Sequence, residues 1–111
     1  MIRLGQEAEN LAATFLQRQG LKLVARNYRC RMGEIDLVMN DRGTLVFVEV
    51  RLRKNPRFGG AGASITAHKQ SKLIRAAQHY LQQQSLQPPC RFDAVLLDGG
   101  NMEWVKDAFD A

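Results

Sequence analysis

Gly33-Glu34-Ile35-Asp36-Leu37-Val38 and Leu45-Val46-Phe47-Val48-Glu49-Val50-Arg51 are apolar stretches that each enclose a carboxylate. Asn40-Asp41-Arg42-Gly43 lies between them, and its residue types favour a tight turn. The pattern predicts an antiparallel hairpin with strands at Glu34–Met39 and Thr44–Leu52. An acid among Val, Ile, Leu and Phe costs several kcal/mol in desolvation unless cations or hydrogen-bond donors offset it. A shared divalent metal ion is one such cation.

The register of this hairpin decides whether Asp36 and Glu49 meet. A loop centred on Asp41-Arg42 pairs Glu34 with Glu49 and Asp36 with Phe47. Asp36 and Glu49 are then diagonal neighbours on one face, with Cβ atoms roughly 7 Å apart. A loop of odd length without a bulge would separate them onto opposite faces. Oxygen ligands of this kind suit Mg²⁺ or Mn²⁺, and the alternative is that arginines across the sheet neutralise the acids.

Upstream of the hairpin, the segment Leu4–Gln19 is predicted to be an amphipathic helix that stops at Gly20. Its apolar stripe consists of Leu4, Ala8, Leu11, Ala12, Phe15 and Leu16. Glu7 and Glu9 lie on the two borders of this stripe, so either can face the sheet. Spacing alone does not choose between them.

A second helix is predicted from an N-cap at Thr66 to about Gln84. Lys69 lies at the N-terminal end of its inward stripe, where it either extends to water or reaches a site, whereas His68 and His79 lie off the stripe and are expected at the surface. The other expected segments are a strand at Leu21–Arg31, a loop at Arg53–Thr66, a core strand at Arg91–Leu97, a short edge strand at Met102–Val105 and a tail at Lys106–Ala111. The predicted fold class is α/β, with a central mixed sheet of four to five strands flanked by two helices in the order αβββαββ.

Length and composition bound the class of protein. A chain of 111 residues fits one domain, spanning residues 1–111. No run approaches the roughly 20 apolar residues that span a bilayer, and no signal peptide is evident, so we expect a cytoplasmic protein without membrane contact. Cys30 and Cys90 show no metal-binding spacing and are expected to be reduced, partly buried thiols.

Positive charge is concentrated in the middle of the chain. Residues 22–75 contain twelve Lys and Arg against four Asp and Glu, whereas the two flanks together carry four bases and seven acids. A basic surface around an acidic centre suits a polyanion such as nucleic acid, and the alternative is a solvated basic face without a partner. The candidate contacts to nucleic acid are Arg29, Arg31, Arg53, Lys54, Arg57 and Lys72.

Several motifs together resemble the YraN-like family of small bacterial proteins, most of which are functionally uncharacterised. They are Ala8-Glu9 through Leu16, Arg26-Asn27-Tyr28-Arg29-Cys30-Arg31, Gly33-Glu34-Ile35-Asp36-Leu37, Val46-Phe47-Val48-Glu49-Val50-Arg51, Phe58-Gly59-Gly60 and Cys90-Arg91-Phe92-Asp93. The family's fold is similar to the restriction-endonuclease-like (PD-(D/E)XK) superfamily, which includes Holliday-junction resolvases. The resemblance implies Asp36 and Glu49 as metal ligands, Glu9 as the helix acid and a homodimer as the assembly.

The chain departs from the family pattern after the second acid. The family's Glu-Val-Lys reads Glu49-Val50-Arg51 here, and arginine stays protonated, so it can stabilise negative charge but cannot activate a water. Either Lys69 takes the part of that lysine, or activity is weak or lost. Three functions therefore stay open: a metal-dependent endonuclease acting on branched or single-stranded DNA, a catalytically inactive nucleic-acid-binding module, and a protein-interaction adaptor with a basic face.

Overall fold

The computed structural model describes residues 4–52, 65–85, 87–98 and 100–110. Its elements, in chain order, are α1 (Leu4–Arg18), β1 (Lys22–Cys30), β2 (Gly33–Asp41), β3 (Thr44–Leu52), α2 (Ala67–Gln84), β4 (Cys90–Asp98) and β5 (Asn101–Phe109). This order confirms the predicted αβββαββ fold. The predicted loop at Arg53–Thr66 lies almost entirely outside the described residues.

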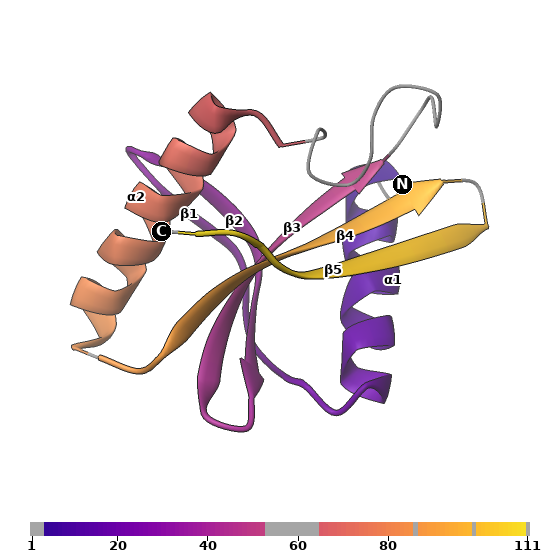
Figure 1. Cartoon of the computed structure of the whole chain (residues 1–111), viewed down its shortest axis with the longest axis horizontal. Coiled ribbons are helices and arrows are strands. Elements are labelled where there is room, and N and C mark those ends of the chain that lie inside the picture. Colours follow the sequence, from indigo (N-terminus) through magenta and orange to yellow (C-terminus); the bar gives the residue numbers. More distant parts are fainter. Residues whose placement is uncertain (1–3, 53–64, 86, 99, 111) are drawn as a thin grey trace.

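The five strands form one mixed sheet in the order β1-β2-β3-β4-β5. All neighbours pair antiparallel except β3 and β4, which run parallel. A parallel pair needs a long crossover, and α2 lies on the connection between these two strands. Figure 1 shows α1 and α2 on opposite sides of the sheet.

Each helix covers its own apolar core. Ala12, Ala13 and Leu16 of α1 pack with Leu37, Met39, Val46 and Val48, and Leu73, Ala76 and Tyr80 of α2 pack with Ile35, Val38, Phe47 and Phe92. Because β3 is buried on both faces, its sequence is almost continuously apolar. Leu11 does not belong to this core, against the prediction, since it is 55% exposed. Ala13 is buried instead, so the buried stripe of α1 is rotated from the predicted one.

The ends of the helices follow local sequence signals. Thr66 caps α2 as predicted, because its Oγ1 accepts the amide hydrogen of Lys69 at 3.1 Å. Ser85 ends the helix with a left-handed backbone at φ 53°. Gly20 follows α1 with φ +100°, a conformation that glycine adopts without a steric cost.

The hairpin turn lies one residue further along the chain than predicted. Arg42 and Gly43 both have positive φ, 54° and 96°, as a two-residue hairpin loop of type I′ requires, and Asp41 pairs with Thr44. Val38 therefore pairs with Phe47, and the expected pairing of Asp36 with Phe47 is wrong by two residues. An even shift does not exchange the faces of a strand.

The C-terminal strand is longer than predicted. β5 spans nine residues, Asn101–Phe109, so most of the expected tail at Lys106–Ala111 belongs to the sheet. A left-handed residue, Asp107 at φ 54°, accompanies a register shift between Phe92 and Ala94. Beyond it, the Phe109 ring stacks on Phe92 with centroids 4.8 Å apart.

Candidate acidic site

Asp36 lies where the pairing of β2 with β3 ends. The last paired residues are Leu37 and Val48, and the next rung would join Asp36 to Glu49. The Asp36 carboxylate occupies this position, because its Oδ2 accepts the Val50 amide hydrogen at 2.9 Å. The two predicted ligands are thus on facing strands, one rung beyond the last backbone pair.

The surroundings of Asp36 disfavour its ionised form. Its pKa is raised from 3.8 to about 7, first by burial and then by the charges of Glu49, Glu9 and Glu34, against the opposing effect of the Val50 hydrogen bond. The carboxyl is therefore substantially protonated near neutral pH. A cation bound beside it would favour the ionised form.

Glu49 is a buried acid, and its two carboxylate oxygens have different surroundings. The residue is 5% exposed, and its Oε2 is buried and has no hydrogen-bond partner among the described residues. Oε1 lies 3.7 Å from Lys69 Nζ and 3.9 Å from Arg51 Nη1. Burial raises the pKa of Glu49, and Lys69 and then Arg51 oppose that rise.

Lys69 approaches Glu49 because of how α2 begins. The Thr66 cap sets the first turn, and four buried residues of α2 hold its inward face on the sheet: Leu73, Ala76, Ala77 and Tyr80. Lys69 follows this face at its N-terminal end, as predicted, and its ammonium group reaches the acid. The sequence left two alternatives for Lys69, extension to water or contact with a site, and in the structure its side chain contacts Glu49.

Of the two border acids of α1, Glu9 is the one near Asp36. Glu9 is half-buried and its charge contributes to the raised pKa of Asp36, whereas Glu7 is exposed. A polar cavity of about 270 Å³ adjoins Glu9 and is lined by Gln6, Glu9, Asn10, Arg26 and Asn27. Glu9, which the resemblance implies as the helix acid, is thus the α1 acid whose charge acts on Asp36.

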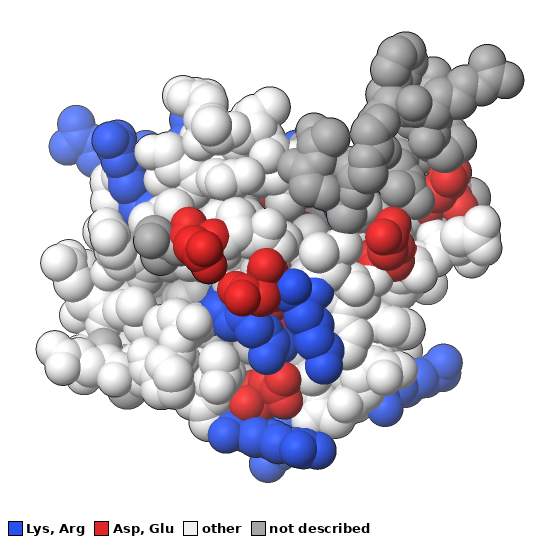
Figure 2. All heavy atoms as spheres, viewed as in Figure 1, with Lys and Arg blue, Asp and Glu red and all other residues white. Residues whose placement is uncertain are grey.

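Three of the six predicted nucleic-acid contacts lie in the described part of the chain: Arg29, Arg31 and Lys72. All three are exposed, and the Arg29 side chain, 73% exposed, pairs loosely with Glu34 at 3.5 Å. The turn after Arg31 lies against α2, since a Cβ added to Gly33 would lie 3.3 Å from the Lys72 carbonyl oxygen. Arg53, Lys54 and Arg57 lie outside the described residues. The face shown in Figure 2 has intermixed basic and acidic groups, so no field of a single sign covers that face.

Asp93 is a buried acid that the sequence reading did not single out as a site. It is 1% exposed and accepts from Arg91 Nε and Nη2 at 2.8 and 2.9 Å, from Trp104 Nε1 at 3.0 Å and from the Asp107 amide at 2.9 Å. Its position inside the apolar run Phe92–Leu97 was the available signal. Because both oxygens are fully partnered, Asp93 serves to join β4 to β5, in contrast to Glu49.

Two minor expectations need correction. His79 is not a free surface residue, because it is half-buried and its Nδ1 shares a hydrogen bond with the Tyr28 hydroxyl. Both cysteines are free, but only Cys30 is partly buried, and Cys90 is exposed. Cys90 starts a strand immediately after the prolines, which leaves its side chain at the surface.

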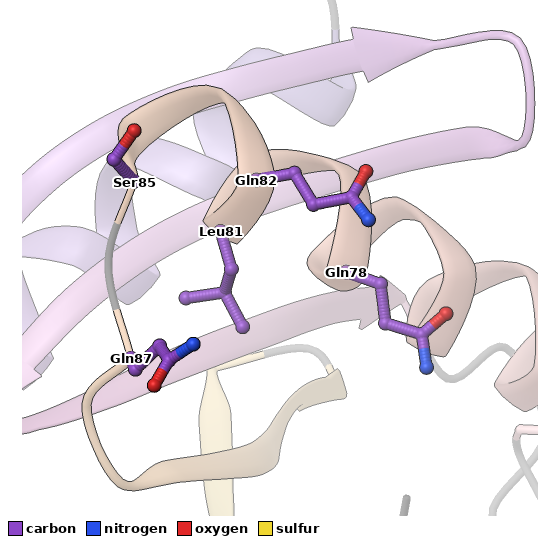
Figure 3. A pocket seen from close by; sticks show the side chains of 5 residues that line it. All are labelled: Gln78, Leu81, Gln82, Ser85 and Gln87. Carbon is purple, nitrogen blue, oxygen red and sulfur yellow. The ribbon is translucent and has the colours of Figure 1, made fainter.

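A further hollow is lined by uncharged side chains. It measures about 870 Å³ beside the end of α2 and is lined by Gln78, Leu81, Gln82, Ser85 and Gln87. Figure 3 shows Leu81 pointing from α2 toward Gln87. None of these five lining residues can act as an acid, a base or a charged metal ligand.

Asp36 and Glu49 make up only part of a metal site. In the described ranges, no three His, Cys, Asp or Glu side chains gather closely enough to form a complete metal site. Asp36 and Glu49 nevertheless supply carboxylate oxygens, including the unpartnered Oε2, which are the donors that Mg²⁺ and Mn²⁺ prefer.

Neither of the helices, as far as they are described, is long and apolar enough to cross a membrane.

The fold and site define a mixed α/β protein with an acidic pair at the centre of its sheet. The chain belongs to the uncharacterised protein family UPF0102, the YraN-like group, whose model matches residues 8–97. It is 59% identical to a UPF0102 protein of Nitrosomonas europaea over 109 residues, covering 96% of this chain and 92% of the relative. It is also 56% identical to a UPF0102 protein of Methylobacillus flagellatus over 114 residues, covering both chains completely.

Proposed function

We propose that this chain is a metal-dependent nuclease-like protein that binds DNA and cleaves its phosphodiester backbone. The observation that carries the proposal is that a half-buried Asp36 lies opposite a buried Glu49 whose Oε2 has no partner in the described part of the chain. Two acids with raised pKa values, facing each other on neighbouring strands, destabilise the folded state unless they serve a function such as ligand binding. A divalent cation is the simplest such use.

In this proposal Asp36 and Glu49 hold Mg²⁺ or Mn²⁺, and Glu9 assists from α1. Such a metal polarises a phosphate and lowers the pKa of an attacking water. With only two carboxylates close together, most coordination positions would go to water and phosphate, as is usual for Mg²⁺. Lys69 and Arg51, which already lie beside Glu49 Oε1, would stabilise the negative charge of the phosphate. Arg29, Arg31 and Lys72 would contact the nucleic-acid backbone.

Cleavage assays test this proposal directly. The protein is incubated with branched, single-stranded and duplex DNA and with RNA. Each substrate is tested in the presence of Mg²⁺, of Mn²⁺ and of a chelator. We expect metal-dependent cleavage of at least one DNA form, its loss in Glu49→Gln, and no change in Glu7→Gln, an exposed acid used as the matched control. Absence of cleavage of every substrate with both metals would contradict the proposal.

A second candidate is a catalytically inactive nucleic-acid-binding module, which Arg51 in place of the family lysine favours. It predicts salt-sensitive binding that chelators do not change. Replacing Arg29, Arg31 or Lys72 by Gln would then each lower the salt slope by about 1. Lack of any binding at low salt would exclude both functions and leave the adaptor.

A further inference from the structure

The ladder between β1 and β2 skips one rung, and the skipped rung contains Asp36. Arg26 pairs with Leu37 and Tyr28 pairs with Ile35, but the intervening Asn27 and Asp36 are not paired. Asn27 has a left-handed backbone, with φ 50°. Residues other than glycine adopt this conformation rarely, and asparagine is among the few that tolerate it.

Both strands exchange faces at this rung. Ala25 and Tyr28 contact the same α2-side core although they are three residues apart, while Arg26 between them bonds Asn10 of α1. In β2, Ile35 belongs to the α2-side core and Leu37 to the α1-side core although they are two residues apart. Regular alternation would give the opposite result in both strands. Because both strands rotate at the same rung, the register on either side is unchanged.

This rotation determines where the Asp36 carboxylate lies. A residue on a regular strand would direct its side chain into one of the two cores. Asp36 instead reaches the edge of β3, where its Oδ2 accepts the Val50 amide hydrogen. Asn27, across the rung, lines the same polar cavity as Glu9. The left-handed residue thus adjoins both the cavity beside Glu9 and the rung that contains Asp36.

From this relationship we infer that Asn27 is a positioning residue, whose left-handed backbone turns the rung and aims the Asp36 carboxylate at β3 beside Glu49. The inference rests on the proposed function only for its consequence on metal binding. It concerns backbone conformation, so glycine at this position preserves the role. A β-branched residue, which disfavours positive φ, abolishes it.

Amide hydrogen exchange of metal-free protein tests the positioning without assuming any activity. We expect Asn27→Val to speed exchange of the Val50 amide about tenfold relative to the Phe47 and Val48 amides, because the Asp36 acceptor moves away. Asn27→Gly should leave it unchanged. Ser85→Val is the matched control, since Ser85 also has a left-handed backbone, at φ 53°, but ends α2. Unchanged Val50 exchange in Asn27→Val, or equal acceleration in Ser85→Val, would overturn the inference.

Mn²⁺ binding measured by electron paramagnetic resonance gives the second readout. We expect about tenfold weaker binding in Asn27→Val and wild-type binding in Asn27→Gly. If the wild-type protein binds no Mn²⁺, the proposed function fails while Val50 exchange still decides the role of Asn27. Should Asn27→Val not fold, Asn27→Ala carries both measurements with a smaller expected effect.

Discussion

Oδ2 of Asp36 accepts the Val50 amide hydrogen at 2.9 Å, one rung beyond the last backbone pair of β2 and β3. A carboxylate thereby replaces the backbone acceptor that a continued ladder would have provided. The arrangement holds Asp36 of β2 opposite Glu49 of β3 and links the two strands through the Asp36 side chain. Keeping these two acids together in a partly buried site costs free energy.

The stability of the protein should fall as the pH rises through the range in which Asp36 is protonated in the folded state but ionised in the unfolded state. Its pKa is raised from 3.8 to about 7, so between these values the folded state binds more protons than the unfolded state. The free energy of unfolding then decreases with increasing pH. We expect Asp36→Asn to be more stable than the wild type by about 1–3 kcal/mol at about pH 8, as the part-exposed site retains only a fraction of the full shift.

Urea unfolding at about pH 4 and about pH 8 measures this effect. The advantage of Asp36→Asn should shrink toward the lower pH, where Asp36 is protonated in the folded wild type and about half protonated in the unfolded chain. A stability difference that does not depend on pH would show that Asp36 does not titrate as the structure indicates.

Divalent cations should stabilise the protein through Glu49. A ligand that binds only the folded state raises the free energy of unfolding by about 2.7 kcal/mol at a hundredfold excess over its Kd. We expect Mn²⁺ to raise the Tm of the wild type and of Glu7→Gln, and to have no effect on Glu49→Gln. The measurement is thermal unfolding at about pH 8, and an equal rise in all three proteins would point to binding elsewhere.

Arg51→Lys should increase any cleavage activity. A lysine beside Glu49 can orient or deprotonate a water, whereas Arg51 stays charged, and proton transfer by a positioned group contributes about 10²–10⁴-fold. We expect a gain of at least about tenfold in Arg51→Lys and a loss in Lys69→Met. Lys72→Met, one turn further along α2, should retain the cleavage step and weaken binding only. If Lys69→Met behaved like Lys72→Met, Lys69 would have no part in the reaction.

Asp93→Ala should strongly destabilise the fold. It leaves the Trp104 and Asp107 donors without their acceptor and leaves Arg91 paired with Asp41 alone, and breaking a buried ion pair costs about 3–5 kcal/mol. Trp104→Phe removes a single donor and should cost about 1 kcal/mol from the lost hydrogen bond. Urea unfolding compares the two variants. Similar losses in both would show that the ring of Trp104, rather than Asp93, joins β4 to β5.

Sequence patterns predicted the elements well because each has a local cause. The apolar runs around Asp36 and Glu49, the Thr66 cap and the apolar run after Arg91 each act over a few residues, and the structure confirms the elements that they predict. The hairpin register was wrong because Arg42, rather than Asp41, is the first left-handed residue of the turn. Type I′ turns accept several residue types, and only backbone conformation distinguishes the two alternatives.

The site was harder to predict than the fold. The acids and Lys69 were found because charged residues in apolar patterns are conspicuous. The rotation at Asn27 and Asp36 was not predicted. Both strands change faces at the same rung, so the register on either side is the same and the residue spacing does not reveal the change. Asp93 has its partners on β4 and β5, and the length of β5 was itself underestimated, since Asp107 interrupts its pattern.

Anomalous diffraction from crystals soaked in Mn²⁺ at about pH 8 tests the central claim most directly. We expect one anomalous peak bound by both the Asp36 and the Glu49 carboxylates, with Glu49 Oε2 among its ligands, and no such peak in Glu49→Gln. A wild-type crystal without density there, with the Arg51 guanidinium or the Lys69 ammonium occupying the space between the two acids, would contradict it.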